Sequence, residues 1–465
     1  MKIFPILPLF LGGLLIQTLV FAQPKVVQKP NIILIMADDL GWGDVGFNGN
    51  TIIRTPALDQ MASDGLVFDR FYAGSAVCSP TRGSCITGRN PYRYGINFAN
   101  VGMMKKDEIT LAELAKNIGY RTAHFGKWHL GSLSKNIKDG RRGGNENVYS
   151  PPWENGFETC FSTEQAVPTW DPMKDQSIAG TRYWTGSEQA ATENLEGDDS
   201  RVMMDRVIPF IQDAATKKTP FLAVIWFHAP HAPVVAGPTY LNMYASHDEN
   251  KQHYYGCITA MDEQIGRLRQ QLKALNLADN TLITFCSDNG PAGEGGGTKQ
   301  YAGQRQQGVT GGFRGRKGVL YEGGLRVPGI VVWPKEIKSG QHTSFPAVTS
   351  DYFSTILGIW GLDLPKRPYD GTNLMPVLKG KSSERSGFIG FQIPKQQSIV
   401  DQQYKLITND QKTFELYDLI EDPYEKNDLA AKNPQRVEQM KASLFEWLES
   451  CKKSNNGADY HEDED

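Results

Sequence analysis

The chain has 465 residues, of which 40% are hydrophobic and 22% charged, an ordinary balance for a globular protein with a large core. Its length exceeds that of one typical domain, so we expect one large domain and a smaller one, or two domains. The formal net charge of −3 argues against nucleic acid as a partner, because nucleic-acid-binding domains usually carry a basic surface.

The N-terminus has the pattern of a secretory signal. A basic start precedes an apolar run that ends at Ala22, with small or apolar residues where a signal peptidase cleaves. The run approaches the length of a membrane span, which leaves a membrane anchor as the alternative. Pro5 and Pro8 within the run favour cleavage instead. We therefore predict that residues 1–22 are a signal peptide, and that the mature protein is periplasmic or secreted and not an integral membrane protein.

Apolar runs alternate with helical patterns along the chain, which is typical of a mostly parallel sheet covered by helices. The expected strands are residues 31–36, 120–124, 221–227, 281–286 and 329–333. The expected helices are residues 56–63, 110–118, 199–217, 252–275 and 351–357. Thr110 and Glu113 form a capping box at the start of the second of these helices.

The C-terminal part has a different pattern. Residues 365–370 look like a linker, and two extended runs at 398–408 and 413–418 predict an antiparallel hairpin. A helix is expected over residues 434–451. Residues 454–465 are polar and acidic, and we expect this tail to be frayed.

Together these patterns predict an α/β fold. Residues 23–375 would form a domain with a mostly parallel sheet flanked by helices, and residues 376–465 a smaller C-terminal α+β subdomain that carries an antiparallel sheet. A long glycine-rich basic loop, residues 290–318, interrupts the first domain, and loops of this length are usually functional or disordered. The loop lacks the Gly-Lys-Ser/Thr ending of a phosphate-binding loop, so nucleotide binding is not supported.

Six cysteines could form disulfides in an exported chain. They show no close paired spacing and lie in segments with the pattern of a core, and a chain of this size does not need disulfides for stability. We expect no large disulfide framework. The six are Cys78, Cys85, Cys160, Cys257, Cys286 and Cys451.

Acidic and amide side chains follow two of the expected strands. Asp38 and Asp39 come after the first strand, and Asp288 and Asn289 come after the strand at 281–286. In open α/β sheets, ligands bind at the edge formed by the carboxyl ends of the strands. Oxygen ligands of this kind suit Ca²⁺ or Mg²⁺, whereas no His or Cys group has the spacing of a zinc site. The alternative is that Asp and Asn simply favour turns.

Two further segments place basic and imidazole groups after strands. Lys127 and His129 follow the strand at 120–124, in an expected loop, and such groups can bind anions and move protons. A solvated surface pair is the alternative. His228 and His231 follow the strand at 221–227 in a loop that two prolines stiffen, and a structural role remains open for His228.

Cys78 begins the run Cys-Ser-Pro-Thr-Arg, and Thr-Gly-Arg follows a few residues later. Taken alone, this run also fits a turn that leads into a short helix with an inert buried thiol. Arg82 could clamp an anion with two hydrogen bonds or pair with a carboxylate. Lys317 has glycine neighbours that permit close approach of the backbone, with a mobile basic loop as the alternative.

Taken together, these motifs resemble the formylglycine-dependent sulfatases of the alkaline-phosphatase-like superfamily, and the resemblance extends over nearly the whole mature chain. Thr81 and Cys85 depart from the residues usual in that family, but neither replaces the required Cys, Pro or Arg. The matching segments are residues 31–43, 78–89, 126–131, 229–233, 287–290 with 317–326, and 415–423.

The resemblance implies that a maturation enzyme oxidises Cys78 to formylglycine, whose hydrate attacks the sulfur of a sulfate ester. Arg82 would orient and stabilise this hydrate. One Ca²⁺ would touch both the modified residue and the sulfate. The residues that would hold the ion are Asp38, Asp39, Asp288 and Asn289, together with the side chain at Cys78.

The resemblance also implies roles for the remaining basic groups. Lys127 and His231 would contact the sulfate oxygens, and Lys317 with His231 would assist the leaving oxygen. His129 would take the proton from the second hydroxyl of the hydrate, so that sulfate is expelled.

The expected substrate is a sulfated carbohydrate. Export and the aromatic residues Trp153, Trp170, Tyr183 and Trp184 favour it, although these aromatic residues fit loop packing equally well. A phosphatase or phosphodiesterase of the same fold is one alternative, which the cysteine at the nucleophile position disfavours. A glycan-binding protein that has lost catalysis is another, which the complete set of candidate catalytic residues disfavours.

Overall fold

The computed structural model describes residues 1, 29–142, 144–174, 180–293 and 307–460. The predicted signal peptide, part of the glycine-rich loop and the last five residues of the tail lie outside these ranges.

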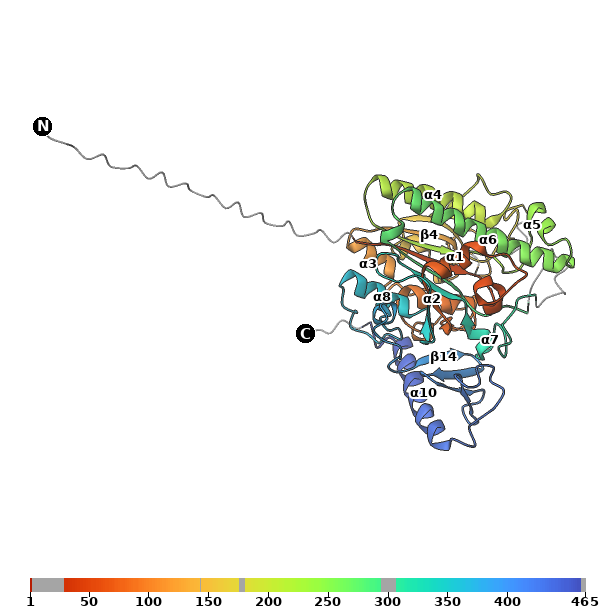
Figure 1. Cartoon of the computed structure of the whole chain (residues 1–465), viewed down its shortest axis with the longest axis vertical. Helices are drawn as coiled ribbons and strands as arrows, with labels where there is room; N and C mark the ends of the chain where they lie inside the picture. The colour runs from red at the N-terminus through yellow and green to blue at the C-terminus, as the bar shows by residue number, and fades with distance from the viewer. Residues whose placement is uncertain (2–28, 143, 175–179, 294–306, 461–465) are drawn as a thin grey trace.

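A ten-stranded sheet forms the centre of the larger part of the molecule (Figure 1), in the order β12-β2-β11-β9-β1-β8-β4-β5-β6-β7. The five consecutive strands β9, β1, β8, β4 and β5 are parallel, and antiparallel pairing begins outside them at β11 and β6. The prediction of a mostly parallel sheet is thereby confirmed at the centre of the sheet. The central strands are β9 (Thr281–Ser287), β1 (Asn31–Ala37), β8 (Phe221–Trp226), β4 (Arg121–Lys127) and β5 (Thr159–Thr163). The outer strands are β12 (Gln341–Thr343), β2 (Leu66–Phe68), β11 (Gly329–Val332), β6 (Trp184–Gly186) and β7 (Gln189–Ala190).

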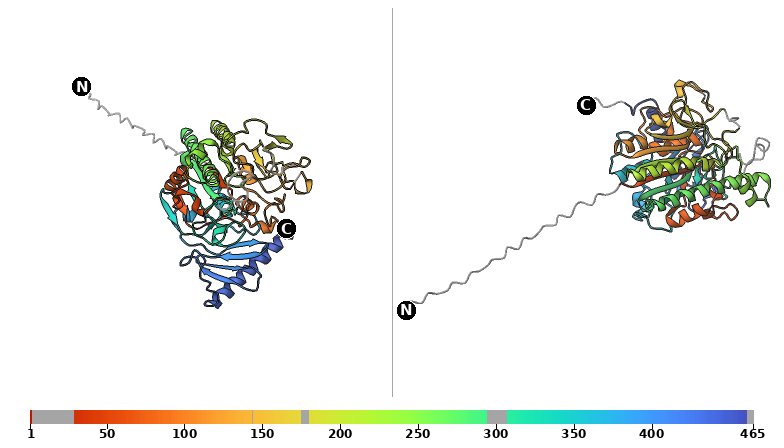
Figure 2. Two further views of the ribbon diagram at one scale, coloured as in Figure 1. Left: turned by 90° about the vertical axis from the view of Figure 1, so that its right-hand side faces the viewer. Right: turned by 90° about the horizontal axis from the view of Figure 1, so that it is seen from above.

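Helices cover both faces of this sheet (Figures 1 and 2). Strand β1 shows why, because its side chains alternate between two cores: Ile33 and Ile35 belong to one, and Ile32 and Leu34 to the other. A strand buried on both faces has a continuous apolar sequence rather than an alternating one. The first core includes α1 (Pro56–Asp64), α4 (Asp199–Thr216) and α6 (Glu249–Ala274). The second includes α2 (Cys78–Thr87), α3 (Leu111–Asn117) and α8 (Asp351–Trp360).

One boundary in the larger domain differs from the prediction in a way that affects the site. Strand β4 continues to Lys127, whereas the sequence predicts that Lys127 lies in a loop. The strand is longer because it is central: Lys127 is paired with Thr163 of β5, and Gly126 with Trp226 of β8. Lys127 is therefore 1% exposed, and the alternative of a solvated surface pair is wrong.

The C-terminal part contains the predicted antiparallel sheet, which has four strands rather than only the two of the predicted hairpin. The run at 398–408 is two strands, because Asp401 accepts hydrogen bonds from the backbone nitrogens of Gln403 (2.8 Å) and Tyr404 (2.6 Å) and turns the chain. The preceding strand was not predicted. In order along the sheet, the strands are β14 (Ile389–Ile393), β15 (Gln396–Val400), β16 (Tyr404–Thr408) and β17 (Glu415–Asp418).

Helix α10 (Pro434–Asn455) packs on one face of this sheet, and the larger domain packs on the other. The prediction of a frayed tail is wrong for its first residues, up to Tyr460. Asp459 forms an ion pair with buried Arg89 at 2.5 Å, and the Tyr460 hydroxyl donates to Glu108 at 2.5 Å. The boundary placed at residue 375 stays a prediction.

All six cysteines are buried and carry free thiols. Within the described ranges, none of the helices is both long enough and apolar enough to cross a membrane.

Candidate active site

The carboxyl ends of β1 and β9 bring the predicted acidic residues together. The backbone nitrogen of Asp39 donates to Oδ1 of Asp288 at 3.1 Å, and the side-chain nitrogen of Asn289 donates to Oδ1 of Asp39 at 2.6 Å. The loop after β8 closes over them, because the backbone nitrogen of Asp38 donates to the carbonyl oxygen of Ala229 at 3.0 Å. These side chains, 250 residues apart in sequence, thus form one cluster, and each is at most 2% exposed.

Two buried cations neutralise the inner side of this cluster. Nη2 of Arg82 lies 2.6 Å from Oδ2 of Asp288 and 3.5 Å from Oδ2 of Asp38. Nζ of Lys127 lies 2.7 Å from Oδ2 of Asp38, and Arg82 also donates to the carbonyl oxygen of Lys127 at 3.0 Å. Burial alone would raise the pKa of Asp38, but the nearby charges, above all Lys127, hold it well below its usual value. The carboxylate therefore stays ionised.

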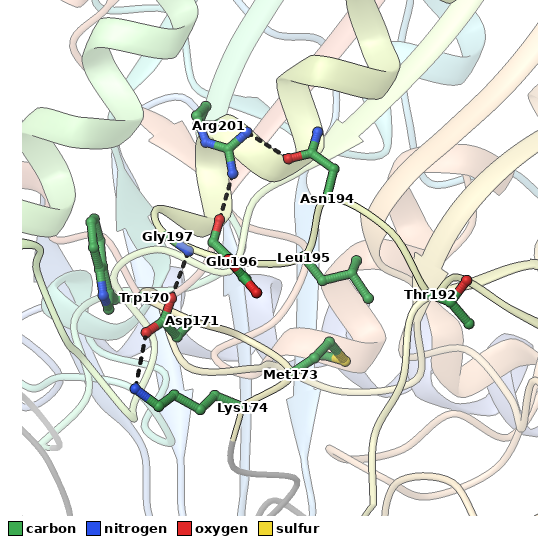
Figure 3. Close-up of a pocket in the computed structure, with 10 residues that line it drawn as sticks. All are labelled: Trp170, Asp171, Met173, Lys174, Thr192, Asn194, Leu195, Glu196, Gly197 and Arg201. Carbon is green, nitrogen blue, oxygen red and sulfur yellow. Dashed lines mark hydrogen bonds and ion pairs between the residues drawn. The ribbon is translucent and has the colours of Figure 1, made fainter.

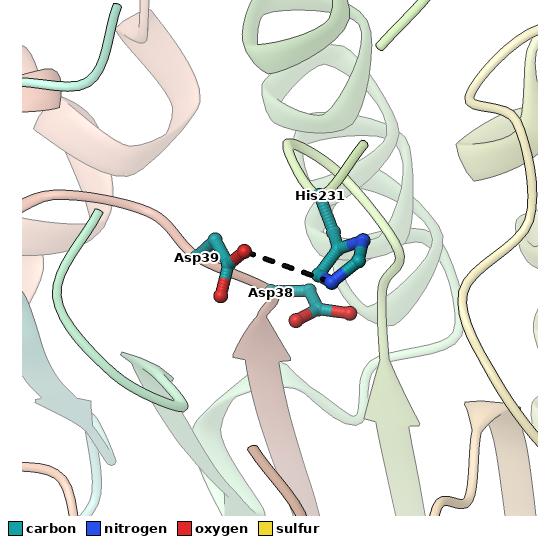
Figure 4. Close-up of side chains that lie close together, drawn as sticks. All are labelled: Asp38, Asp39 and His231. Carbon is teal, nitrogen blue, oxygen red and sulfur yellow. Dashed lines mark ion pairs between the residues drawn. The ribbon is translucent and has the colours of Figure 1, made fainter. Parts of the chain in front are cut away.

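Lys317 and His231 lie on the more open side of the cluster. Nζ of Lys317 donates to both oxygens of Asp39, at 2.7 and 2.8 Å. Nε2 of His231 lies 3.7 Å from Oδ2 of Asp39, and Figure 4 shows the imidazole facing both aspartates. The side chains of His231 and Lys317 are 21% and 16% exposed, whereas those of Asp38 and Arg82 are inaccessible. Among the described residues, the cluster is therefore accessible on the side of His231 and Lys317.

Cys78 is the first residue of α2, and it lies at the bottom of the same site. Its Sγ and carboxylate oxygens of Asp38 and Asp288 all lie within 4.8 Å of one another. Burial raises the pKa of the Cys78 thiol, and this outweighs the opposite effect of Lys127 and Lys317. The encoded side chain is therefore a neutral thiol at pH 7 and a poor nucleophile.

The acidic cluster fits a hard divalent cation. Oδ1 of Asp38 and Oδ1 of Asn289 are buried and have no hydrogen-bond partner in the part of the chain that the structure describes. Burial raises the pKa of Asp288 to about 7, and the adjacent charge of Asp38 adds to this rise. Unpaired oxygens and crowded carboxylates of this kind are the ligands that Ca²⁺ and Mg²⁺ prefer. The two closest groupings are Asp38, Asp39 and His231, and Asp38, Cys78 and Asp288.

The hydrogen bonds of His129 and His231 leave one nitrogen of each ring free to accept a proton. Nε2 of His129 lies 2.8 Å from Oδ1 of Asn100, and Nδ1 of His231 lies 2.7 Å from the carbonyl oxygen of Ala232. Both partners are acceptors, so these nitrogens carry the hydrogens. Burial lowers the pKa of both imidazoles, which keeps them neutral and leaves Nδ1 of His129 and Nε2 of His231 as bases.

His228 does not face the cluster. It is fully buried between Thr163, whose Oγ1 lies 2.8 Å from Nε2, and Asp199, whose Oδ2 lies 2.8 Å from Nδ1. The structural role left open for it is therefore the correct one. It anchors the base of the loop that carries His231.

Asn100, which orients His129, was not predicted from the sequence. A buried ion pair near it was also missed: Nη1 of Arg142 lies 2.5 Å from Oε1 of Glu164, and Arg142 donates to the carbonyl oxygen of His129 at 3.2 Å. The only local signal at Asn100 is the short Asn-Val-Gly turn that begins there, which does not indicate a partner 29 residues away.

The site thus combines a carboxylate cluster, neutralised by Lys127 and Arg82, with Cys78 at the start of a buried helix. A comparison with known protein families agrees with this arrangement. The profile of the sulfatase family matches residues 30–362. The chain belongs to the sulfatase family. It is therefore a sulfuric ester hydrolase of the alkaline-phosphatase-like superfamily. A second profile, described as N-sulphoglucosamine sulphohydrolase, C-terminal, matches residues 311–454.

Known sulfatases resemble this chain over most of their length. N-acetylgalactosamine-6-sulfatase of Sus scrofa is 32% identical over 382 residues, which cover 78% of this chain and 68% of that protein. Arylsulfatase G of Rattus norvegicus is 32% identical over 378 residues, covering 76% and 69%. The crystal structure of Ps i-CgsB is 27% identical and superposes with a TM-score of 0.79, covering 91% of this chain and 93% of that one. The same protein in complex with k-i-k-neocarrahexaose gives a TM-score of 0.78.

Proposed function

We propose that this sulfatase is exported and hydrolyses sulfate esters of a carbohydrate, with a formylglycine made from Cys78 and one bound Ca²⁺. The observation that carries the proposal is the position of Cys78. It begins a buried helix, lies within 4.8 Å of Asp38 and Asp288, and shares the site with Lys127 and Lys317.

Modification of Cys78 requires a separate maturation enzyme. The conversion is a two-electron oxidation in which the sulfur leaves Cβ as hydrogen sulfide and a carbonyl oxygen takes its place, and the oxidant belongs to that enzyme. Once formed, the hydrate of the aldehyde would supply the hydroxyl that attacks sulfur. The raised pKa of the thiol supports this, because a neutral buried thiol is not suited to act as encoded.

The chain's own residues would then bind the sulfate and move protons. Lys127 and Lys317 would place positive charge beside the sulfate oxygens, where charge develops during transfer. At the open side of the site, Nε2 of His231 would accept the proton of the attacking hydroxyl and, together with Lys317, deliver it to the oxygen of the leaving alcohol. Nδ1 of His129 would accept the proton whose removal expels sulfate, since Asn100 engages the other nitrogen.

Ca²⁺ would be held by Asp38, Asp39, Asp288 and Asn289, whose oxygens include two without hydrogen-bond partners in the described ranges. When bound, the ion would offset the negative charge of the sulfate in a site that already contains three carboxylates. Arg82 would keep Asp288 oriented from the inner side.

Carbohydrate is the substrate class that the relatives support, since one is named for N-acetylgalactosamine 6-sulfate and a solved neighbour holds a hexasaccharide. The four aromatic residues named in the sequence analysis have different surroundings in the structure. Tyr183 and Trp184 are fully buried core residues, and Trp153 donates to the hydroxyl of Tyr149 at 3.1 Å. Trp170 lines a cavity.

Mass spectrometry of the peptide that contains Cys78, from protein made in its native host or with a maturation enzyme, would test the proposal directly. We expect an aldehyde in place of the thiol, and sulfate release from N-acetylgalactosamine 6-sulfate or a sulfated oligosaccharide such as k-i-k-neocarrahexaose. Cys78→Ala should fold normally and release no sulfate. Finding only the unmodified thiol in active protein would contradict the assignment of the nucleophile.

Export is tested separately, by fractionating the native host and sequencing the mature N-terminus. We expect the protein outside the cytoplasm, beginning close after Ala22. A cytoplasmic, uncleaved chain would contradict this part of the proposal.

A further inference from the structure

A cavity of about 1050 Å³ lies between two loop segments that precede and follow β6 and β7 (Figure 3). None of the predicted catalytic or metal-binding residues lines it. Its volume is close to the upper limit for sites that bind small molecules. The lining residues are Trp170, Asp171, Met173, Lys174, Thr192, Asn194, Leu195, Glu196, Gly197 and Arg201.

The cavity lies at the same edge of the sheet as the active site. The segment that contains Trp170 follows the carboxyl end of β5, and Arg201 lies in the first turn of α4, which leads back along the sheet. Residues 169–171 pair with residues 197–199: the backbone nitrogen of Asp171 donates to the carbonyl oxygen of Gly197 at 2.7 Å. The two walls of the cavity are thus held together.

The same segment is bonded to the loop that carries His231. The backbone nitrogen of Thr169 donates to the carbonyl oxygen of Pro233 at 3.3 Å, and its hydroxyl both donates to and accepts from Val235 at 2.7 Å. Standard backbone dimensions then limit the separation between the Cα atoms of Trp170 and His231 to roughly 18 Å. Since the cluster is accessible beside His231, a short oligosaccharide spans this distance.

Trp170 is built into the cavity wall. A Cβ atom at Gly237 would lie 2.0 Å from Cζ3 of the indole, so only glycine allows the ring to pack against this backbone. The side chain of Trp170 is partly exposed, and its indole nitrogen has no hydrogen-bond partner among the described residues. The ring thus offers an apolar surface and a free donor together, which suits the C–H face and hydroxyls of a sugar.

The charges of the cavity are balanced. Two carboxylates, Asp171 and Glu196, face two cations, Lys174 and Arg201. Arg201 is already committed to Asp205, Asn194 and the carbonyl oxygen of Glu196, and Asp171 accepts from the backbone nitrogen of Gly197 at 2.6 Å. The cavity has no excess positive charge to attract a second sulfate or carboxylate, because Lys174 lies 3.7 Å from Asp171 and Arg201 is paired with Asp205.

We infer that this cavity binds an uncharged sugar unit that neighbours the sulfated one in the same chain. This rests on the proposed function and narrows it: the preferred substrate is a sulfated oligosaccharide rather than a free sulfated monosaccharide. Trp170 stacks on the neighbouring sugar, and Glu196 and Thr192 bind its hydroxyl groups.

The test compares three esters: 4-nitrophenyl sulfate, which is too small to reach the cavity, N-acetylgalactosamine 6-sulfate, and k-i-k-neocarrahexaose. Trp170→Ala should lower kcat/KM on the oligosaccharide about ten-fold or more, the usual size of an effect at a central aromatic contact, and leave hydrolysis of 4-nitrophenyl sulfate unchanged. Trp170→Phe should retain part of the preference. Thr192→Trp, which fills the cavity from the opposite wall, should reproduce the loss without touching the His231 loop.

Equal loss of activity on all three esters in Trp170→Ala, with no loss in Thr192→Trp, would overturn the inference, because it would show that Trp170 only supports the His231 loop. A wild-type enzyme with a higher kcat/KM on the monosaccharide than on the oligosaccharide would also overturn the inference. Hydrolysis of 4-nitrophenyl sulfate with no release of sulfate from either carbohydrate would overturn the carbohydrate assignment itself. Failure of the carbohydrate assignment can therefore be told apart from failure of the cavity inference, which concerns only the activity of the Trp170 and Thr192 variants on the oligosaccharide.

Discussion

Nε2 of His129 donates a hydrogen bond to Oδ1 of Asn100 at 2.8 Å, and this bond determines which ring nitrogen can act as the base. His129 has a positive φ of 59°, so its backbone is held in an unusual conformation just after β4. Asn100 is fixed in turn by Gln165, which donates to the same oxygen at 3.2 Å. The imidazole is therefore oriented by side chains from two loops.

Asn100→Asp should move the acidic limb of the kcat/KM–pH profile to higher pH. Burial now lowers the pKa of His129, with a further lowering by Lys127. A carboxylate beside the ring favours the protonated imidazole and raises such a pKa by about 1–3 units. As the pH falls, His129 is therefore protonated, and no longer able to act as a base, at a higher pH than in wild type. Asn100→Ala should instead misplace the imidazole of His129 and lower kcat by up to about 100-fold. It should not move the acidic limb of the profile to higher pH. Superimposable profiles for wild type and Asn100→Asp would show that His129 is not the base.

Calcium should stabilise the folded protein through the acidic cluster. A ligand present at 100 times its Kd adds about 2.7 kcal/mol to the free energy of unfolding, which appears as a higher Tm after calcium is added to EDTA-treated protein. Asp38→Asn should lose this increment, because it removes a carboxylate with an unpaired buried oxygen. Asp213→Asn, a partly exposed surface change on α4, should keep it. An equal increment in Asp38→Asn would place the ion elsewhere.

A second prediction about stability concerns Lys405, which joins the C-terminal sheet to the segment that carries Lys317. Nζ of Lys405 lies 3.2 Å from Glu322 and 2.8 Å from Glu425, and all three side chains are buried. Glu322 begins α7 (Glu322–Leu325), five residues after Lys317. Removing one partner of a buried ion pair costs about 3–5 kcal/mol, so Lys405→Met should lower the free energy of unfolding by this amount and raise KM.

The double variant Lys405→Met with Glu425→Gln provides the control. It removes the carboxylate of Glu425, which loses its cation in Lys405→Met, whereas Glu322 keeps Arg326 at 3.5 Å, so it should recover part of the stability. Urea unfolding followed by circular dichroism measures both changes. If the double variant is less stable than Lys405→Met, the loss comes from packing of the lysine stem rather than from charge.

The acidic cluster could be predicted from the sequence because of a general property of parallel sheets. Asp38 and Asp288 each follow a strand with a continuous apolar pattern, and the carboxyl ends of such strands meet at one edge. The contacts of Asn100 and Asp459 could not be predicted, since their partners lie 29 and 370 residues away and no local pattern indicates them. Strand β14 was missed for a related reason: its edge position is determined by pairing with β15 rather than by its own composition.

The stability of the junction between the two parts should depend on pH through Asp370. Its carboxylate lies 2.8 and 2.9 Å from two nitrogens of Arg93 and accepts hydrogen bonds from the backbone nitrogen of Asn90 (2.6 Å) and from Trp447 of α10 (2.8 Å). Burial alone would raise the pKa of Asp370, but Arg93 and these hydrogen bonds hold it below its usual value.

Because the pKa of Asp370 is lower in the folded state than in the unfolded chain, the ionised carboxylate stabilises the fold above the unfolded pKa of about 4, and this stabilisation is lost as the pH falls through the folded pKa. The free energy of unfolding should therefore fall below about pH 4. Asp370→Asn should lose about 3–5 kcal/mol at pH 7, since Arg93 stays buried without its partner, and should show a smaller further loss on acidification. Asp363→Asn, an exposed change just before the linker, should follow the wild-type curve. If the free energy of unfolding of Asp370→Asn falls with pH as steeply as that of wild type, the junction does not depend on this charge.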